Sequence, residues 1–469
     1  MTFNRRLFLK GAGALGLSTV GTSLTNFTAH AADTTGYKAL VCVFLLGGMD
    51  GYDTLLPLDN ENYDSLASIR EALFNQYAAL PGGSSREQNR ILELAPDNAA
   101  SFGSRRFGLP EQMPGLKNLF DSGDAAIVAN VGPLIEPVDR DGFNQQTATL
   151  PQRLFSHNDQ QSTWQSSQPE GAQLGWGGQF GDAVFNSGGA SSPDFITLTS
   201  LGNEVFLTGQ RVRPFNLGIA GPVEVTALEF FEDRAANGMD EQAAALLRSH
   251  FRQMEFNRSN LFETDMASAM RGAIDSNDSF NAAREMAIPL STQFPGSFLG
   301  SQLRAVAETI SIRSTLLVNR QVFFVGIGGF DTHDNQVQDL PGLHTQIDQA
   351  VTAFYSAMQE LGTTDEVTLF TASDFGRTLA INGDGTDHGW GNNHFVVGGA
   401  VNGNQIYGTP PPYSFGHGQD AGSGRAIPTI AVDEYAAAMG RWFGLTEAEL
   451  QQALPSLPNF AGRPPLGFI

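Results

Sequence analysis

Five short apolar runs, each beside a loop rich in Gly, Asp or Asn, constrain the fold of this chain most. They span residues 40–46, 125–131, 322–327, 367–371 and 395–397. Continuous apolar runs of this length are typical of strands buried on both faces of a parallel sheet. Segments with helical periodicity separate them, at residues 113–120, 303–314 and 343–361. Alternating strands and helices predict an α/β fold with a doubly wound, mainly parallel sheet.

The N-terminal 31 residues have the composition of an export signal. They hold Arg5, Arg6 and Lys10 and no acidic residue, followed by a weakly apolar run at residues 11–20 and by Ala29-His30-Ala31. A basic start, a short apolar stretch and small residues before a cleavage point define a signal peptide. The string at residues 4–10, with its paired arginines, resembles the twin-arginine signal. We therefore expect residues 1–31 to be removed after passage through the twin-arginine export machinery, and the protein to be periplasmic or secreted.

The remaining chain, residues 32–469, is expected to form one large α/β domain. The full sequence has 41% hydrophobic and 16% charged residues, which excludes a disordered chain. Between residues 228 and 286 the sequence shows helical patterns without strand signals, which predicts a helical insertion of unknown role. No apolar run approaches the ~20 residues that a membrane-spanning helix needs.

The charge of the chain restricts its partners. Without residues 1–31 it carries 24 basic and 49 acidic residues, a net charge of −25. Such a surface repels nucleic acid and anionic membranes. A cleft that holds cations could still bind a small anionic substrate. Cys42 is the single cysteine, so no disulfide can form within the chain.

Side chains that bind metals follow the predicted strands. They are Asp50, Asp331, His333, Asp374, His388 and His394. Of the eight histidines, four fall on these loops: the three just named and His157. Ligands gather beyond the carboxyl ends of strands in α/β sheets. Carboxylates and imidazoles there suit a divalent ion such as zinc. A structural interpretation remains open: Asp50 or Asp331 could cap a helix, and His388 or His394 could be hydrogen-bonded structural groups.

Several long phrases of the sequence resemble the exported bacterial family known as domain of unknown function 1501. They lie at residues 47–57, 156–159, 328–333, 373–378 and 386–394 and include Gly-Gly-Met-Asp, Ser-His-Asn-Asp and Gly-Gly-Phe-Asp-Thr-His. The family is in turn similar to the alkaline phosphatase and sulfatase superfamily. This resemblance implies an alkaline-phosphatase-like α/β sheet with a site for two divalent ions, zinc or manganese, at the strand ends.

The resemblance also implies residue roles. Asp50 takes the place of the carboxylate after the first strand and Ser156 that of the hydroxyl nucleophile, although Ser156 could equally open a helix as its N-cap. Asp331 and His333 would serve the first ion, with Asn335 at the more usual spacing for the histidine. Asp374 matches an Asp-His pair in which Phe375 replaces the histidine, so that either Asp387-His388 supplies the pair or one ion is lost. His388 or His394 would close the site, and Arg377 would bind an oxyanion or form a structural ion pair.

These features predict an exported metal-dependent hydrolase of a phosphate or sulfate ester. The alternative is a non-catalytic exported protein that binds a partner or an envelope component on the same fold. A serine esterase is a third interpretation, which the lack of a Gly-x-Ser-x-Gly phrase before a helix disfavours.

Overall fold

The computed structural model describes residues 31–469 except 203, 220, 223–227, 229, 232–233, 236, 238–240 and 254–259. Residues 31–469 form one compact unit. The predicted signal segment lies outside the described residues, apart from Ala31. No helix in the described part of the chain has the length and hydropathy needed to cross a bilayer.

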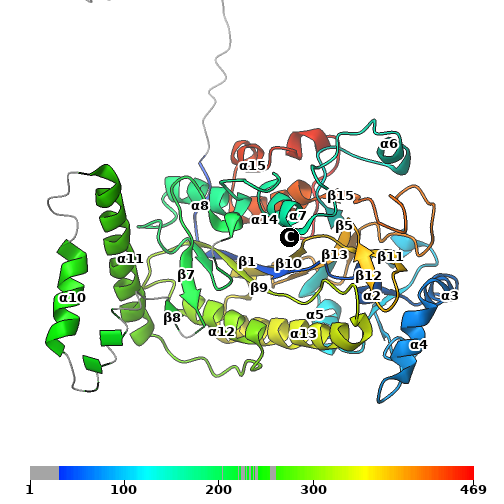
Figure 1. Cartoon of the computed structure of the whole chain (residues 1–469), viewed down its shortest axis with the longest axis horizontal. Coiled ribbons are helices and arrows are strands. Elements are labelled where there is room, and N and C mark those ends of the chain that lie inside the picture. The colour runs from blue at the N-terminus through cyan, green and yellow to red at the C-terminus, as the bar shows by residue number, and fades with distance from the viewer. Residues whose placement is uncertain are drawn as a thin grey trace, which may run out of the picture. The chain divides into compact units, whose positions relative to one another are not determined.

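A central sheet of ten strands organises the described residues (Figure 1). Its strands are β1 (Lys38–Leu45), β5 (Ala125–Gly132), β6 (Thr197–Thr199), β7 (Phe215–Gly218), β8 (Gly221–Pro222), β9 (Arg320–Ile327), β10 (Val367–Ser373), β13 (Asn392–Val397), β14 (Ile406–Gly408) and β15 (Ile430–Ala431). Their order is β14-β5-β13-β10-β1-β9-β6-β7-β8, with β15 also paired to β5. β1 lies in the middle and pairs in parallel with both β10 and β9. The prediction of a mainly parallel α/β sheet is therefore confirmed.

One predicted strand runs against the others. β13 is antiparallel to both β10 and β5. The apolar run at residues 395–397 thus belongs to the sheet as an antiparallel strand, a direction that an apolar run by itself does not predict. Because β13 is reversed, its first residue, Asn392, lies at the edge of the sheet where β1 and β10 end.

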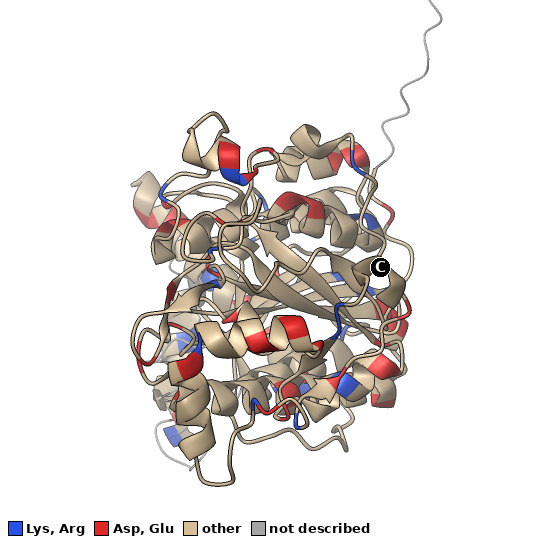
Figure 2. Cartoon of the chain, turned by 90° about the vertical axis from the view of Figure 1, so that its right-hand side faces the viewer, with Lys and Arg blue, Asp and Glu red and all other residues tan. Residues whose placement is uncertain are grey.

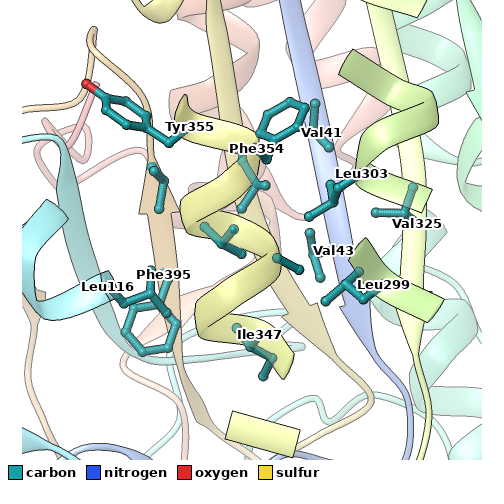
Figure 3. Close-up of a cluster of buried hydrophobic side chains, with 14 of the residues drawn as sticks. Val41, Val43, Leu116, Leu299, Leu303, Val325, Ile347, Phe354, Tyr355 and Phe395 are labelled. Carbon is teal, nitrogen blue, oxygen red and sulfur yellow. The ribbon is translucent and has the colours of Figure 1, made fainter. Parts of the chain in front are cut away.

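Helices cover both faces of the sheet (Figure 1). They are α5 (Pro114–Asp121), α7 (His157–Ser166), α8 (Trp176–Asn186), α12 (Phe298–Ser311), α13 (Gln336–Leu361), α14 (Val432–Phe443) and α15 (Glu447–Ala453). One face packs α5, α12 and α13, with Leu303 and Phe354 against Val41 and Val43 (Figure 3). The opposite face packs α7, α8 and α14, with Trp176 against Phe370. Successive side chains of β1 enter the two cores alternately, which explains its unbroken apolar sequence.

Further elements complete the described chain. They are helices α2 (Gly51–Thr54), α3 (Asn60–Ile69), α4 (Glu71–Ala79) and α6 (Arg140–Asn144), four 3-10 turns at Ala99–Phe102, Val205–Leu207, Thr364–Glu366 and Leu457–Phe460, and strands β2 (Leu56–Pro57), β3 (Leu92–Glu93), β4 (Phe107–Leu109), β11 (Arg377–Ile381) and β12 (Thr386–His388). The region 228–286 contains α10 (Glu241–Gln253) and α11 (Leu261–Glu285), separated by residues outside the description. Asp and Glu lie over the outer helices with fewer Lys and Arg among them (Figure 2), in keeping with the acidic composition.

Candidate metal centre

The strand-end loops meet tightly at one edge of the sheet, beyond β1, β9 and β10. Gly47 follows β1 with a φ of +112°, and a Cβ on it would lie 2.3 Å from the backbone nitrogen of Asp331. Its own backbone nitrogen donates to Oδ1 of Asp374 at 3.1 Å. Only glycine tolerates both the left-handed backbone and this close approach. The glycine after β1 therefore allows the loops after β9 and β10 to come together.

Three side chains from three separate segments form a cluster with metal-ligand chemistry. Atoms of His157, Asp331 and His388 lie within 4.8 Å of one another. Oδ1 of Asp331 lies 3.4 Å from Nε2 of His157 and 3.3 Å from Nε2 of His388. His333 adjoins them, with its Nε2 3.2 Å from the same oxygen and 2.8 Å from Nε2 of His388. One carboxylate oxygen thus faces three imidazole nitrogens.

The other nitrogen of two of these rings is held from behind. Nδ1 of His157 lies 2.6 Å from Oδ2 of Asp374, and Nδ1 of His388 lies 2.7 Å from the backbone oxygen of Phe155. Both partners are acceptors, so each Nδ1 carries the proton and each Nε2 presents a lone pair to the cluster. The Nε2 of His157 is buried and has no hydrogen-bond partner among the described residues. This carboxylate-histidine arrangement is the usual support of a metal-bound imidazole.

Asp374 and Arg377 position the cluster from the β10 side. Asp374 is fully buried and also accepts a hydrogen bond from Nε2 of Gln161 at 2.8 Å. Arg377 donates from its terminal Nη2 to Oδ1 of Asp331 at 2.7 Å and also contacts the backbone oxygens of Gly48 and Phe330. Arg377 is only 1% exposed, and its contact with Asp331 orients that carboxylate from the buried side. The structure thus favours the structural ion pair that the sequence left open.

Local charges set the protonation of the cluster. The hydrogen bond with Asp374 raises the pKa of His157 above its ordinary value, although burial opposes it. Burial lowers the pKa of His388. Burial also disfavours ionisation of Asp331, but the hydrogen bond and charge of Arg377 outweigh it and lower the pKa of that carboxyl. Near neutral pH, Asp331 is ionised and His388 is neutral, the states in which both can bind a cation.

The donor set fits a single divalent ion. For zinc bonds of about 2.0 Å, two tetrahedral ligands lie about 3.3 Å apart. The distances of 3.2–3.4 Å from Oδ1 of Asp331 to the three Nε2 atoms match that spacing. Without a cation, the lone pair of His157 would face a carboxylate, whereas that of His388 can accept from Nε2 of His333. His157, Asp331 and His388, with His333 beside them, are therefore suited to hold one ion.

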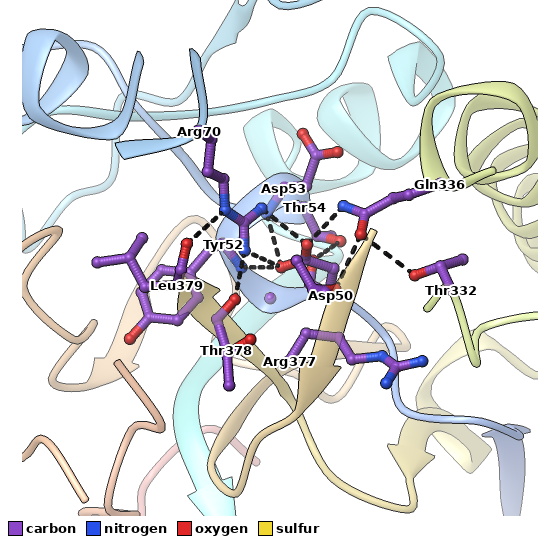
Figure 4. Close-up of polar contacts among 12 residues, drawn as sticks. Asp50, Tyr52, Asp53, Thr54, Arg70, Thr332, Gln336, Arg377, Thr378 and Leu379 are labelled. Carbon is purple, nitrogen blue, oxygen red and sulfur yellow. Dashed lines mark hydrogen bonds and ion pairs between the residues drawn. The ribbon is translucent and has the colours of Figure 1, made fainter. Parts of the chain in front are cut away.

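Asp50, predicted as a ligand, lies outside this cluster and is fully engaged elsewhere (Figure 4). Arg70 binds it through both oxygens, at 2.7 and 3.1 Å, and Gln336 donates to it at 2.7 Å. Oδ1 of Asp50 also accepts the backbone nitrogens of Tyr52 and Asp53, which makes Asp50 the N-cap of α2. The guanidinium of Arg70 already neutralises this carboxylate, so a second ion does not fit at Asp50.

His394 is also separate from the cluster. It lies within β13 and is fully buried, with its ring 4.9 Å from that of Trp164 and stacked on Tyr435 at 6.1 Å. Its Nδ1 contacts the hydroxyl of Thr371 at 3.2 Å. Burial lowers the pKa of His394 to about 3, so the ring is neutral. The loop predicted to carry His394 ends at Asn392, where the strand begins, and the inward direction of the side chain places it in the core.

Ser156, the predicted nucleophile, precedes His157 at the N-cap position of α7. Its side chain makes no capping bond to the helix backbone and donates instead to Oδ2 of Asp159 at 2.9 Å. Ser156 is half-buried, and Asp159 is almost fully buried. The hydroxyl of Ser156, one residue before His157 of the cluster, thus has a carboxylate as its acceptor.

Sequence reasoning missed two contributors to the site. His157 was counted among the loop histidines without a role, and Gln161 was not considered. Their spacing of four residues places both on one face of α7, facing Asp374, which is the signal that could have identified them. Phe375, which stands where a histidine was expected, packs its ring 4.8 Å from His157 and 4.5 Å from His388. It therefore packs against the imidazole rings of both His157 and His388.

Comparison with known proteins gives one family and weak structural likenesses. A family model described as "Protein of unknown function (DUF1501)" matches residues 37–452. No match was found among curated proteins. Similar solved structures include Ps i-CgsB in complex with k-i-k-neocarrahexaose, at 8% identity and a TM-score of 0.35 over 90% of this chain and 77% of that one. PsFucS1 sulfatase from Pseudoalteromonas sp. follows at 9% identity and a TM-score of 0.36, covering 88% and 68% of the two chains.

A third similar structure is the lipoteichoic acid synthase LtaP from Listeria monocytogenes. It is 8% identical with a TM-score of 0.28, over 80% of this chain and 67% of that one. Likenesses of this strength say nothing about the chemistry of the site in this chain.

Proposed function

The chain belongs to the DUF1501 family of proteins of unknown function, and we propose that it is an exported, metal-dependent hydrolase of a phosphate or sulfate ester. The observation that carries the proposal is the convergence of the Nε2 atoms of His157 and His388 on Oδ1 of Asp331. These three residues would hold one divalent ion, with His333 as a further ligand. Zinc and manganese are both compatible with nitrogen and carboxylate donors.

Such an ion, when bound, lowers the pKa of a bound hydroxyl or water and stabilises charge that develops on the transferred group. The residues of the chain supply the rest. Asp331 has a side chain that is 48% exposed, so a substrate can reach the cluster from solvent. Arg377 and Asp374 hold Asp331 and His157 in place from the buried side. The chain is net negative, so its surface by itself repels an anionic ester. The bound ion would supply the local positive charge that attracts the ester to this site.

Ser156 is the nucleophile in this proposal. Its hydroxyl already donates to Asp159, so that Asp159 can take the proton as Ser156 Oγ attacks the phosphoryl or sulfuryl centre. The alcohol leaves with the ester oxygen and takes the proton that Asp159 received, and water then hydrolyses the enzyme-bound group and restores the hydroxyl of Ser156. If water attacks directly instead, Ser156→Ala retains most of the turnover, and this assignment fails while the hydrolase proposal stands.

Export by the twin-arginine machinery is part of the proposal and rests on the sequence of residues 1–31. This route exports folded proteins, which would allow the ion to be bound before export. Changing Arg5 and Arg6 together to Lys keeps the charge and is expected to stop the protein from reaching the periplasmic or secreted fraction. Unchanged fractionation of that variant would contradict the export route.

The decisive experiment joins metal content to turnover. The purified protein, loaded with zinc or manganese, is assayed on aryl phosphates and aryl sulfates, and its metal is measured by elemental analysis. We expect about one bound ion per chain, and loss of both ion and turnover in His157→Ala and Asp331→Ala. His250→Ala, an exposed histidine on α10, is the matched control and should retain both. No turnover above that of Asp331→Ala would overturn the hydrolase proposal.

One observation favours a second candidate, a non-catalytic exported protein that binds a partner or an envelope component. Arg70 fills the place beside Asp50 where a second ion was expected. A bound ion without turnover on either class of ester would support this candidate. Its binding site would then be the same cluster, with the ion as a fixed charge that holds an anionic group.

A further inference from the structure

Gln336, the first residue of α13, joins the two ligand-bearing loops to a buried ion pair (Figure 4). Its Nε2 donates to Oδ2 of Asp50 at 2.7 Å. Its Oε1 accepts the hydroxyl of Thr386 at 2.8 Å and that of Thr332 at 3.3 Å. Gln336 is fully buried, as is Asp50. The amide therefore connects three segments that are distant in the sequence.

The threonines on either side of this amide stand next to the cluster ligands. Thr332 lies between Asp331 and His333, and Thr386 lies two residues before His388 in β12. The two loops also contact each other directly, because the backbone nitrogen of Thr386 donates to the backbone oxygen of Thr332 at 3.0 Å. A shift of Gln336 would therefore move both loops against the rest of the site.

The chemistry of the neighbours fixes the orientation of the amide. The carboxylate of Asp50 can only accept, so the NH₂ group must face it, and Oε1 must face the two hydroxyls. Asp50 is itself immobilised by the two-pronged contact with Arg70, whose guanidinium also donates to the backbone oxygens of Thr378 and Leu379. Gln336 thus rests on a rigid, charge-neutral base on one side and holds the ligand loops on the other.

We propose that Gln336 is a positioning residue that sets the spacing between the Asp331 and His388 ligands and so tunes the affinity of the metal centre without touching the ion. The inference rests on the proposed function, because it needs an ion at that cluster. It assigns a purpose to the buried Asp50–Arg70 pair, which binds no ion but anchors Gln336. Residues behind the direct ligands commonly change metal affinity 10–100-fold when removed.

The test compares two buried glutamines. Gln302 is also fully buried and makes two amide hydrogen bonds, both to the backbone of Gly326 in β9. Gln336→Met and Gln302→Met therefore remove similar groups, but only the first lies against the ligand loops. The full chain of each variant is titrated with Co²⁺, whose visible absorption reports ligand geometry, and with Zn²⁺ by competition. Urea unfolding measures stability in parallel.

We expect Gln336→Met to weaken ion binding at least 10-fold and to change the Co²⁺ spectrum, whereas Gln302→Met loses stability with both ion readouts unchanged. Thr386→Val removes a single hydroxyl from the same contact and serves if Gln336→Met does not fold; it should change the spectrum in the same direction. Gln336→Glu should be weaker still, because it places a second carboxylate against Asp50.

Wild-type affinity and spectrum in Gln336→Met or Thr386→Val would overturn the inference and leave the metal centre standing. Equal ion effects in the Gln302 and Gln336 variants would overturn it as well, since they would reflect general destabilisation. If the wild-type protein binds no ion at His157, Asp331 and His388, the proposed function fails first, which the wild-type titration reveals by itself.

Discussion

Nδ1 of His157 lies 2.6 Å from Oδ2 of Asp374, although the two residues are 217 positions apart in the sequence. Asp374 is fully buried and Asp331 is half exposed, so the imidazole bridges the interior and the solvent-facing side of the cluster. The carboxylate fixes the tautomer of His157 and makes the Nε2 lone pair a better ligand for a metal ion. The pair is therefore the part of the candidate site that is most sensitive to a conservative change.

Asp374→Asn should lower the pKa of His157, because the hydrogen bond to the carboxylate is the main cause that raises it. NMR titration of the metal-free protein measures this shift. Zinc affinity should fall about 10–100-fold at neutral pH. In the wild-type protein, affinity should also fall as pH drops through the raised pKa of His157, because the ion and the proton compete for Nε2.

Gln161→Leu is the control for this change. It removes the neighbouring donor to Oδ2 of Asp374 and keeps the charge. It should leave the pKa of His157 above its ordinary value. An unchanged His157 pKa in Asp374→Asn would show that the contact does not set the protonation of the ring.

The buried pair of Arg70 and Asp50 should be worth far more to folding than a surface pair. Arg70→Met leaves the carboxylate of Asp50 buried without its counter-charge, which should cost about 3–5 kcal/mol of unfolding free energy. Arg90→Met breaks a pair with Glu111 whose side chains are 33% and 26% exposed, and should cost below about 1 kcal/mol. Urea unfolding of both variants measures the difference. Equal losses would contradict the anchoring role given to Arg70.

The sheet could be predicted from sequence to the extent that burial decides it. The runs that became β1, β5, β9 and β10 are apolar because both of their faces are covered, and that leaves an unbroken hydrophobic signal. The direction of β13 left no such signal. It follows from the excursion of residues 374–391 through β11 and β12, which returns the chain to the edge where β10 ended.

The candidate site could be predicted only where a ligand sits on a strand-end loop. Asp331 and His388 were expected to converge for that reason, and they do. Asp50 follows the same pattern, but Arg70 neutralises it from the junction of α3 and α4, and nothing in the residues around Arg70 announces this partner. His394 failed as a ligand because its direction depends on the register of β13 with β5, which only pairing in space determines.

An alanine at Gly47 should be destabilising for two reasons, its positive φ and a steric clash of the new Cβ. A second glycine with positive φ but no such clash separates the two effects. Gly47 and Gly123 both have positive φ, +112° and +84°, but a Cβ on Gly123 would meet nothing within 4 Å. Gly123→Ala should therefore cost only the left-handed backbone, about 1–2 kcal/mol. Gly47→Ala should cost clearly more and also weaken ion binding, because the new Cβ pushes on the backbone of Asp331. Similar unfolding free energies for the two variants would rule out the steric explanation.

Asp433, which is not part of the candidate metal centre, should make the unfolding free energy depend on pH. It lies in the first turn of α14, is 3% exposed, and accepts hydrogen bonds from Ser167 at 2.6 Å and from the backbone nitrogen of Ser456 at 2.8 Å. Burial raises its pKa to about 6, against these hydrogen bonds. The folded protein therefore holds a proton on Asp433 at pH values where the unfolded chain, with an ordinary aspartate pKa near 4, has released it.

Since the folded state binds the proton more tightly, this group favours folding increasingly as pH falls from about 7 to 4, and the gain is lost again as pH rises through 6. A shift of about two units corresponds to roughly 3 kcal/mol. Asp433→Asn removes the titration. The unfolding free energy of the wild type minus that of the variant should therefore increase by up to that amount as pH falls from 7 to 4. Groups common to both proteins cancel in the difference, and a pH-independent difference would mean that Asp433 is ionised in the folded state throughout this range.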